Sequence, residues 1–316
     1  MQNNLKSIFS GLLKAGFSLG LLAWLIASGK LDLGLLSGLL NIQSVFIGVL
    51  FIGGSNFLVS ERWRTICQSQ DLQINSFDAF KLSLIGVFFN FAVPGGVGGD
   101  FIKGWYFAKQ NPDAKMLSAT TVLMDRVLGL YAMIIMALLA MCFDVHHVLK
   151  IETLTHLFYM IIGFFIISSV GLTLLFRGLL NKLPIGGRLQ NLIQHAAEIG
   201  KYPKVILKTF IQSLLAQSLS ICFLYFAGSQ MLSLDVNLHT YFLVAPLGFM
   251  ATAIPVSPGG IGVGQAAFFY LFNLYLGSES PLGSTVLTAL QGAQLVFGLG
   301  GAYFYMRIKK DQLSGK

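Results

Sequence analysis

Charged residues are scarce in this chain. They make up 11% of its 316 residues, whereas hydrophobic residues make up 55%. Soluble domains carry about 25% charged residues, so the composition excludes an ordinary soluble protein. It predicts an all-α integral membrane protein, because a helix satisfies its backbone hydrogen bonds within its own segment.

The short motifs of soluble enzymes are absent as well. The chain contains no Walker lysine, no HExxH and no GxSxG sequence. Gly262, Gly264 and Ala267 have the spacing of a dinucleotide fingerprint, but no strand precedes them and no acidic residue follows at the expected distance. We therefore expect no enzymatic activity and no cofactor.

Cysteine is rare, and the three cysteines, Cys67, Cys142 and Cys222, form no CxxC pair. This spacing excludes a disulfide framework and a cysteine metal site. His146 and His147 follow Asp144 closely, which indicates a solvated loop, since a metal site would need further ligands. We expect no metal ion in this protein.

Long apolar runs are present instead, and a bilayer core is spanned by roughly 20 residues. They predict six full spans, at 11–29, 35–59, 118–142, 153–176, 209–232 and 283–306. The first run is too long for a signal peptide and lacks a small-x-small cleavage site. Two further apolar stretches, 77–108 and 240–276, are each interrupted near the middle by a Pro-Gly-Gly cluster.

Basic residues indicate how the chain is oriented. Of the 21 Lys and Arg residues, 18 fall on one face, since only Lys30 and Lys150 lie on the other face and Arg126 lies within a span. Because basic loops stay in the cytoplasm, we expect both termini and the basic loop 177–208 there, in a bacterial inner membrane. The net charge of +8 then reflects orientation, and nucleic-acid binding is not needed to explain it.

This orientation holds only if both interrupted stretches re-enter the membrane. A full crossing by 77–108 would invert every later loop and place the basic loop 177–208 outside. We therefore expect a helical hairpin at 77–108 that opens to the cytoplasm, and one at 240–276 that opens outward. The cytoplasmic loop 177–208 has no counterpart in the first part of the chain.

The two hairpins indicate an inverted repeat within a single membrane domain, 1–316. Pro94 and Pro258 are 164 residues apart, and the same shift carries the span 118–142 onto the last span. The predicted halves are 1–147 and 148–316, as in many secondary transporters. The shift fails for the first two expected spans.

The two clusters place non-helical backbone at membrane depth, which is tolerated where it is buried in protein or lines a wet cavity. Proline ends each incoming half-helix, and glycine permits positive φ and close backbone approach. The residues concerned are Pro94, Gly95, Gly96, Gly98, Gly99, Pro258, Gly259, Gly260 and Gly262. Each outgoing half-helix would begin with free N–H groups that favour an anion; alternatively, the glycines only allow tight helix packing.

Asp125 and Arg126 lie inside a predicted span, about 13 Å from its start at 1.5 Å per residue. Charges at that depth are costly and usually functional. Arg126 would face the anion, while Asp125 would hold a loop N–H or Lys103; a buried structural ion pair is the alternative. Asp100, at the start of a half-helix, would either cap it or act directly on the ligand.

Two basic segments remain, "ERWRTI" at 61–66 and the loop 177–208. Both would lie on anionic lipid headgroups, or serve simply as orientation signals. We further expect the half-helix starts near Gly99 and Gly264 to approach each other beside Arg126. The second half would contribute only polar side chains such as Gln265, Gln291 and Gln294.

Three ordered motifs carry a family resemblance: "PGGVGGDFIKGWYFAK", "MDRVLGL" and "PVSPGGIGVGQAAF". Together they resemble the membrane domain of the lysylphosphatidylglycerol synthetase/flippase family. The resemblance implies a lipid translocator with paired re-entrant elements, without the soluble aminoacyl-transferase domain, since the chain stops at Lys316. Family members often carry an acid where this chain has Gln265, a departure that bears on the charge of the second loop.

These observations predict a flippase-like protein that moves an anionic or zwitterionic phospholipid between leaflets, with the headgroup bound between the two hairpins. Its partners would be membrane lipids, and a membrane-protein partner or a second copy stays open. The alternative is a non-transporting membrane subunit that assists a glycosyltransferase or a cell-envelope enzyme.

Overall fold

The computed structural model describes residues 16–93, 98–182, 186–231, 236–254 and 256–313. Within these ranges the chain is helical and contains no strand, which confirms the all-α prediction. The helices follow from the composition, because long runs of Leu, Phe, Ile and Ala leave backbone groups that only a helix can satisfy in lipid.

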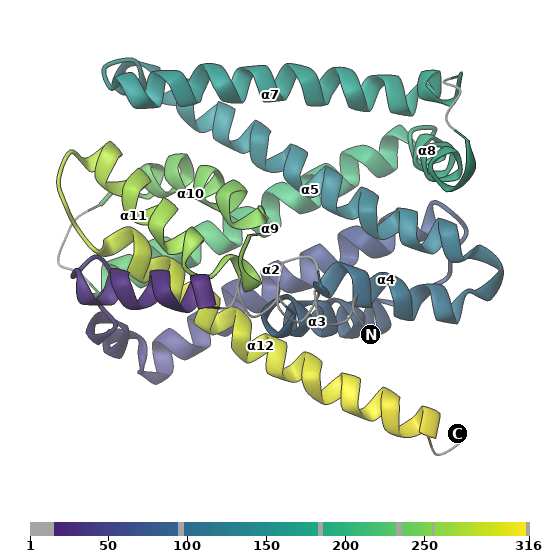
Figure 1. The fold of residues 1–316 in the computed structure, drawn as a ribbon, viewed down its shortest axis with the longest axis horizontal. Helices are drawn as coiled ribbons and strands as arrows, with labels where there is room; N and C mark the ends of the chain where they lie inside the picture. The colour runs from purple at the N-terminus through teal and green to yellow at the C-terminus, as the bar shows by residue number, and fades with distance from the viewer. Residues whose placement is uncertain (1–15, 94–97, 183–185, 232–235, 255, 314–316) are drawn as a thin grey trace. The chain divides into compact units, whose positions relative to one another are not determined.

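Among the residues that the structure describes, five helices are long and apolar enough to cross a membrane, so the protein is a multi-pass membrane protein. They are α2 (Ile42–Gln68), α5 (Lys115–Phe143), α7 (Glu152–Phe176), α9 (Pro203–Met231) and α12 (Leu282–Leu313) (Figure 1). The remaining expected span, 11–29, is the first in the chain and lies partly outside the described residues. Its described part is the helix Gly16–Ala27.

The two interrupted stretches each form a pair of shorter helices, as the Pro-Gly-Gly clusters predict. The first pair is α3 (Ser76–Ala92) and α4 (Gly98–Gln110), and the second is α10 (Leu238–Ala253) and α11 (Val263–Leu276). Pro94, Gly95 and Gly96 lie outside the described residues. Entry and exit of each pair on one side of the membrane remain a prediction.

The helices α10 and α11 pack against each other (Figure 1). Gly248 of α10 makes this packing close, because a Cβ there would overlap the ring of Phe268 on α11. Small residues at helix crossings let backbones approach in this way in membrane proteins. The short helix η4 (Pro258–Gly260) lies in the connection between the two.

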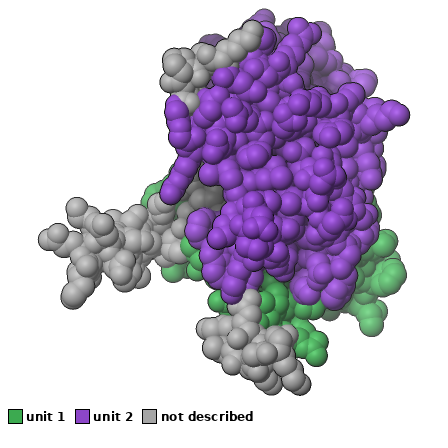
Figure 2. All heavy atoms as spheres, turned by 90° about the vertical axis from the view of Figure 1, so that its right-hand side faces the viewer, with its two compact units in different colours: residues 1–55, 84–99, 218–316 green, residues 56–83, 100–217 purple. Residues whose placement is uncertain are grey.

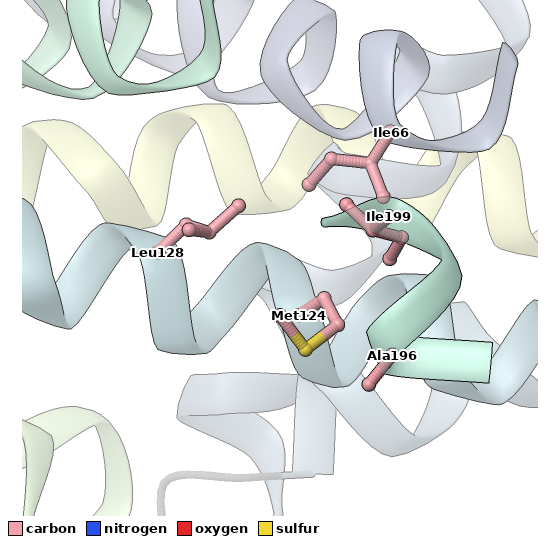
Figure 3. Close-up of a cluster of buried hydrophobic side chains, with 5 residues drawn as sticks. All are labelled: Ile66, Met124, Leu128, Ala196 and Ile199. Atoms are coloured by element: carbon pink, nitrogen blue, oxygen red, sulfur yellow. The ribbon is translucent and has the colours of Figure 1, made fainter. Parts of the chain in front are cut away.

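The basic segment 177–208 is structured, which corrects the prediction of a loop. It contains η3 (Leu179–Lys182) and α8 (Gly187–Ile199), and α9 begins at Pro203, within the expected loop. Ala196 and Ile199 of α8 pack with Ile66, Met124 and Leu128 in a buried cluster (Figure 3). This apolar contact with α2 and α5 holds α8 on the bundle. The other short helices are η1 (Gly34–Leu39), η2 (Pro112–Ala114) and α6 (Val145–Val148).

The chain divides into two compact units, coloured separately in Figure 2. Unit 1 comprises residues 1–55, 84–99 and 218–316, and unit 2 comprises residues 56–83 and 100–217. Helices α2, α3, α4 and α9 each pass from one unit into the other. Both units therefore draw on both predicted halves of the chain.

Helix boundaries agree with the 164-residue shift further than the sequence predicts. The shift carries α3 onto 240–256, α4 onto 262–274 and α5 onto 279–307, within three residues of the starts of α10, α11 and α12. It also carries α2 onto 206–232, beside α9, because α2 continues to Gln68 rather than ending near residue 59. The symmetry of the two halves across the membrane remains a prediction.

Candidate functional site

Arg126 and Asp100 form an ion pair in unit 2. Nη1 of Arg126, on α5, lies 2.5 Å from Oδ2 of Asp100, in the first turn of α4. Both side chains are partly accessible, with exposed fractions of 26% and 39%. The pair therefore combines a cation inside an apolar span with access from outside the protein, as a binding site for a charged group requires.

A second carboxylate, Asp125, lies in a buried charge cluster. Its Oδ1 accepts a hydrogen bond from Nε of Arg62 at 2.7 Å, and Nζ of Lys103 lies 3.4 Å from Oδ2. All three side chains are less than 10% exposed. Of the two partners that the sequence left open for Asp125, a loop N–H or Lys103, the structure shows Lys103. Asp125 fits the alternative of a structural ion pair, which here joins α5 to α2 and α4.

Further contacts fix the two cations of this cluster. Nη1 of Arg62 donates to Oγ of Ser213 at 3.0 Å, and Nζ of Lys103 lies 4.0 Å from the ring centre of Trp63. Such contacts matter because a buried ion pair stabilises only where its remaining donors are satisfied. Two cations and one carboxylate give the cluster of Arg62, Lys103 and Asp125 a net charge of +1.

The prediction that "ERWRTI" lies on lipid headgroups is wrong for Arg62 and Trp63, which are buried. Arg64, two residues later, instead pairs with Glu61 at 2.8 Å. The space for Arg62 lies beside Gly129 on the facing helix, one turn after Asp125. A Cβ at Gly129 would lie 2.8 Å from Nη1 of Arg62, so the glycine leaves room for the guanidinium.

The start of α4 shows how Asp100, Gly98 and Gly99 are used. The side chain of Asp100 pairs with Arg126, whereas the N–H of Gly99 donates to Oδ1 of Asn90 at 3.0 Å. A Cβ at Gly98 would lie 2.6 Å from Cβ of Val93, and one at Gly99 would overlap the carbonyl of Gly86. At these two positions the glycines serve tight packing, which is the alternative that the sequence left open.

The second Pro-Gly-Gly loop follows the predicted backbone geometry. After Pro258, three glycines have positive φ: 56° at Gly259, 72° at Gly260 and 84° at Gly262. This region favours glycine, because a side chain there meets its own backbone. The chain thus turns sharply from η4 into α11.

A chain of side-chain amides holds this loop in place. Oε1 of Gln265 accepts the N–H of Gly262 at 2.8 Å, and Nε2 of Gln265 donates to Oε1 of Gln291 at 2.6 Å. Nε2 of Gln291 in turn donates to the carbonyl of Gly259 at 3.1 Å. The prediction of free N–H groups is therefore wrong for Gly99 and Gly262, since amide side chains already bind them.

The last turn of α3 reaches the second loop within unit 1. A Cβ at Gly259 would lie 2.9 Å from Cδ1 of Phe91, three residues before Pro94. The end of α3 is thus a close neighbour of the second loop. The approach of Gly99 to Gly264 remains a prediction.

Helices of spanning length, interrupted helices and buried charges together define a polytopic α-helical membrane protein. Residues 11–300 match the family model for the lysylphosphatidylglycerol synthase TM region. The chain therefore belongs to this family, as its three motifs indicated, and is a membrane protein related to lipid metabolism. No curated protein matches the chain.

Proposed function

We propose that the protein moves a phospholipid between leaflets and that Arg126 binds the anionic part of its headgroup. The observation that carries this proposal is the accessible ion pair between Arg126 and Asp100. Asp125, which precedes Arg126 in the motif "MDRVLGL", is buried between Arg62 and Lys103 and serves the scaffold. The two adjacent charges of α5 thus separate into a structural residue and a binding residue.

Arg126 suits a phosphate because its planar guanidinium presents paired donors to two oxygens at once. The carboxylate of Asp100 accepts a hydrogen bond from Nη1 of Arg126. A headgroup phosphate competes with this carboxylate for the same donors. When Asp100 turns toward solvent, the positive charge of Arg126 is no longer compensated by a carboxylate. This charge favours the arriving anion.

The second loop, residues 256–262, carries no charged side chain. Gln265 and Gln291 are committed to the loop backbone, and the carboxamide of Gln265 caps the start of α11. A full charge outweighs the partial charge of about half an electron at a helix terminus. We therefore expect the headgroup to bind at Arg126 rather than at the second loop.

The test is reconstitution of the purified protein into liposomes that contain fluorescent phosphatidylglycerol or phosphatidylcholine. Translocation is followed by the loss of outer-leaflet fluorescence after a membrane-impermeant quencher is added. Arg126→Lys should slow transport, because it keeps the charge but loses the paired donors, and Arg126→Ala should abolish it. Both variants are first shown to purify as folded protein.

Arg64 supplies a matched control for Arg126. It too belongs to an ion pair, with Glu61, and its side chain is 25% exposed, close to the 26% of Arg126. Arg64→Ala should leave transport unchanged. Transport that survives Arg126→Ala would contradict the proposal, and an inactive but well-folded wild type would favour the non-transporting subunit.

A further inference from the structure

A cavity of about 410 Å³ lies within unit 2, between α5, α7 and α9. This volume is in the range of ligand pockets in proteins, roughly 300–1,000 Å³. Its walls include Leu128 and Tyr131 of α5, Leu172 and Phe176 of α7, and Leu207 and Phe210 of α9. None of these residues belongs to the ion pairs described above.

The walls of this cavity suit hydrocarbon. Its polar lining side chains are Tyr131, Ser169 and Thr173, and the hydroxyls of Tyr131 and Ser169 bind each other at 2.9 Å. The ring of Tyr131 also stacks on Phe165, with ring centres 6.1 Å apart. Because this hydroxyl pair is already satisfied, the cavity makes little demand for a polar ligand.

The position of the cavity along the helices indicates its depth in the membrane. Its lining residues run from Ser169 to Phe176 on α7 and from Pro203 to Phe210 on α9, about 10 Å at 1.5 Å per residue. Phe176 is the last residue of α7 and Pro203 is the first of α9. One end of the cavity thus lies where both helices end, and the other lies along their apolar spans.

Basic and aromatic side chains surround the end of the cavity where α7 ends and α9 begins. The side chains of Arg177, Tyr202, Lys204 and Lys208 are exposed there, on the residues that end α7 and begin α9. Lys and Tyr are typical of the membrane–water interface. Among the described residues, no carboxylate pairs with Arg177, Lys204 or Lys208, whereas Lys201 pairs with Glu198 at 2.6 Å.

We propose that this cavity holds one acyl chain of an anionic phospholipid whose headgroup lies on Arg177, Lys204 and Lys208. The occupant must be apolar where it meets Leu172 and Phe210 and anionic where it meets the basic helix ends. A phospholipid with net negative charge joins these two properties in one molecule. The site is separate from Arg126, and it does not depend on lipid translocation.

The proposal is tested by photolabelling the full chain in phosphatidylcholine liposomes that contain phosphatidylglycerol with a diazirine on one acyl chain. Labelled peptides are then identified by mass spectrometry. We expect labels to concentrate on 169–176 and 203–210. Excess unlabelled phosphatidylglycerol should reduce them several-fold, and excess phosphatidylcholine should not.

Two variants separate a fixed site from lipid that merely surrounds the protein. Leu172→Trp fills the cavity and should reduce labelling at least fivefold, whereas Ile167→Trp, on an exposed position of the same helix, should not. Lys204→Gln combined with Lys208→Gln should remove the preference for phosphatidylglycerol while leaving the cavity open. Even labelling along α7 that Leu172→Trp does not change, or equal competition by both lipids, would overturn the proposal.

Discussion

Asp125 and Arg126 are neighbours in α5, yet their side chains form separate ion pairs in different surroundings. Oδ1 of Asp125 lies 2.7 Å from Nε of Arg62 in a buried cluster. Nη1 of Arg126 lies 2.5 Å from Oδ2 of Asp100 at a partly exposed position. Adjacent helical residues point about 100° apart, so one charge reaches the interior while the other does not. The two charges should therefore respond differently to mutation.

Asp125→Asn should destabilise the protein strongly. It leaves Arg62 and Lys103 buried without a carboxylate, and breaking a buried pair typically costs about 3–5 kcal/mol. Thermal unfolding in detergent should show a clear fall in Tm. Glu198→Gln, which removes the partner of the exposed Lys201, should cost about 0–1 kcal/mol. An equal Tm for wild type and Asp125→Asn would contradict the structural role.

Asp100→Asn should increase the retention of anionic lipid, because it removes the carboxylate that competes for Arg126. Native mass spectrometry of protein loaded with phosphatidylglycerol would measure retention, and we expect a several-fold gain. Asp78 provides the control, since it pairs with Lys81 and its side chain is 40% exposed against 39% for Asp100. If Asp78→Asn gives the same gain as Asp100→Asn, the effect reflects net charge and not this site.

Gly260→Val should impair the protein through the second loop. Gly260 has a φ of 72°, and a Cβ there would lie 2.7 Å from Cβ of Thr252. The left-handed conformation alone costs a non-glycine residue about 1–2 kcal/mol. Gly186→Val is the matched control, because Gly186 has a negative φ of −84° and no atom lies within 4 Å of its Cβ position. Equal Tm and transport in the two variants would show that the loop geometry is unimportant.

The orientation that the basic residues predict can be tested by labelling single cysteines from outside the cell. The background replaces Cys67, Cys142 and Cys222 with alanine. Asn191→Cys, on an exposed position of α8, should resist an impermeant reagent, and Lys150→Cys, between α6 and α7, should react. Labelling of Asn191→Cys in intact cells would show that α8 lies outside the cell, and the predicted orientation would be wrong.

Local signals in the sequence were sufficient for the long apolar helices and for the interruptions of the two shorter pairs. Proline and glycine end helices wherever they occur in such clusters, so both interrupted stretches divide where the sequence predicts. The contact between Asp125 and Lys103 could also be predicted, because a buried carboxylate needs a cation and the motifs supply one nearby. Gln265 and Gln291, which the sequence offered to the headgroup, instead bind each other and the loop backbone.

Long-range contacts account for what the sequence did not reveal. Arg62 resembles Arg64 locally, and only the space beside Gly129 in the folded chain makes it a buried partner of Asp125. Asn90 accepts the N–H of Gly99, nine residues later in the chain, a contact that no motif in the sequence indicates. The basic residues of the segment 177–208 predict a loop. The helical spacing of its apolar residues instead indicates α8; these residues are Leu192, Ile193, Ala196 and Ile199.

The most direct test of the account is the rate of lipid translocation by a variant in which Arg126 and Asp100 exchange places. Arg126→Asp combined with Asp100→Arg keeps an ion pair between α4 and α5 but moves the cation off α5. We predict that this variant recovers the thermal stability of the wild type in the liposome preparation while phosphatidylglycerol translocation stays at the level of Arg126→Ala. Translocation at the wild-type rate by the exchanged pair would show that the pair is only structural and would contradict the binding role of Arg126.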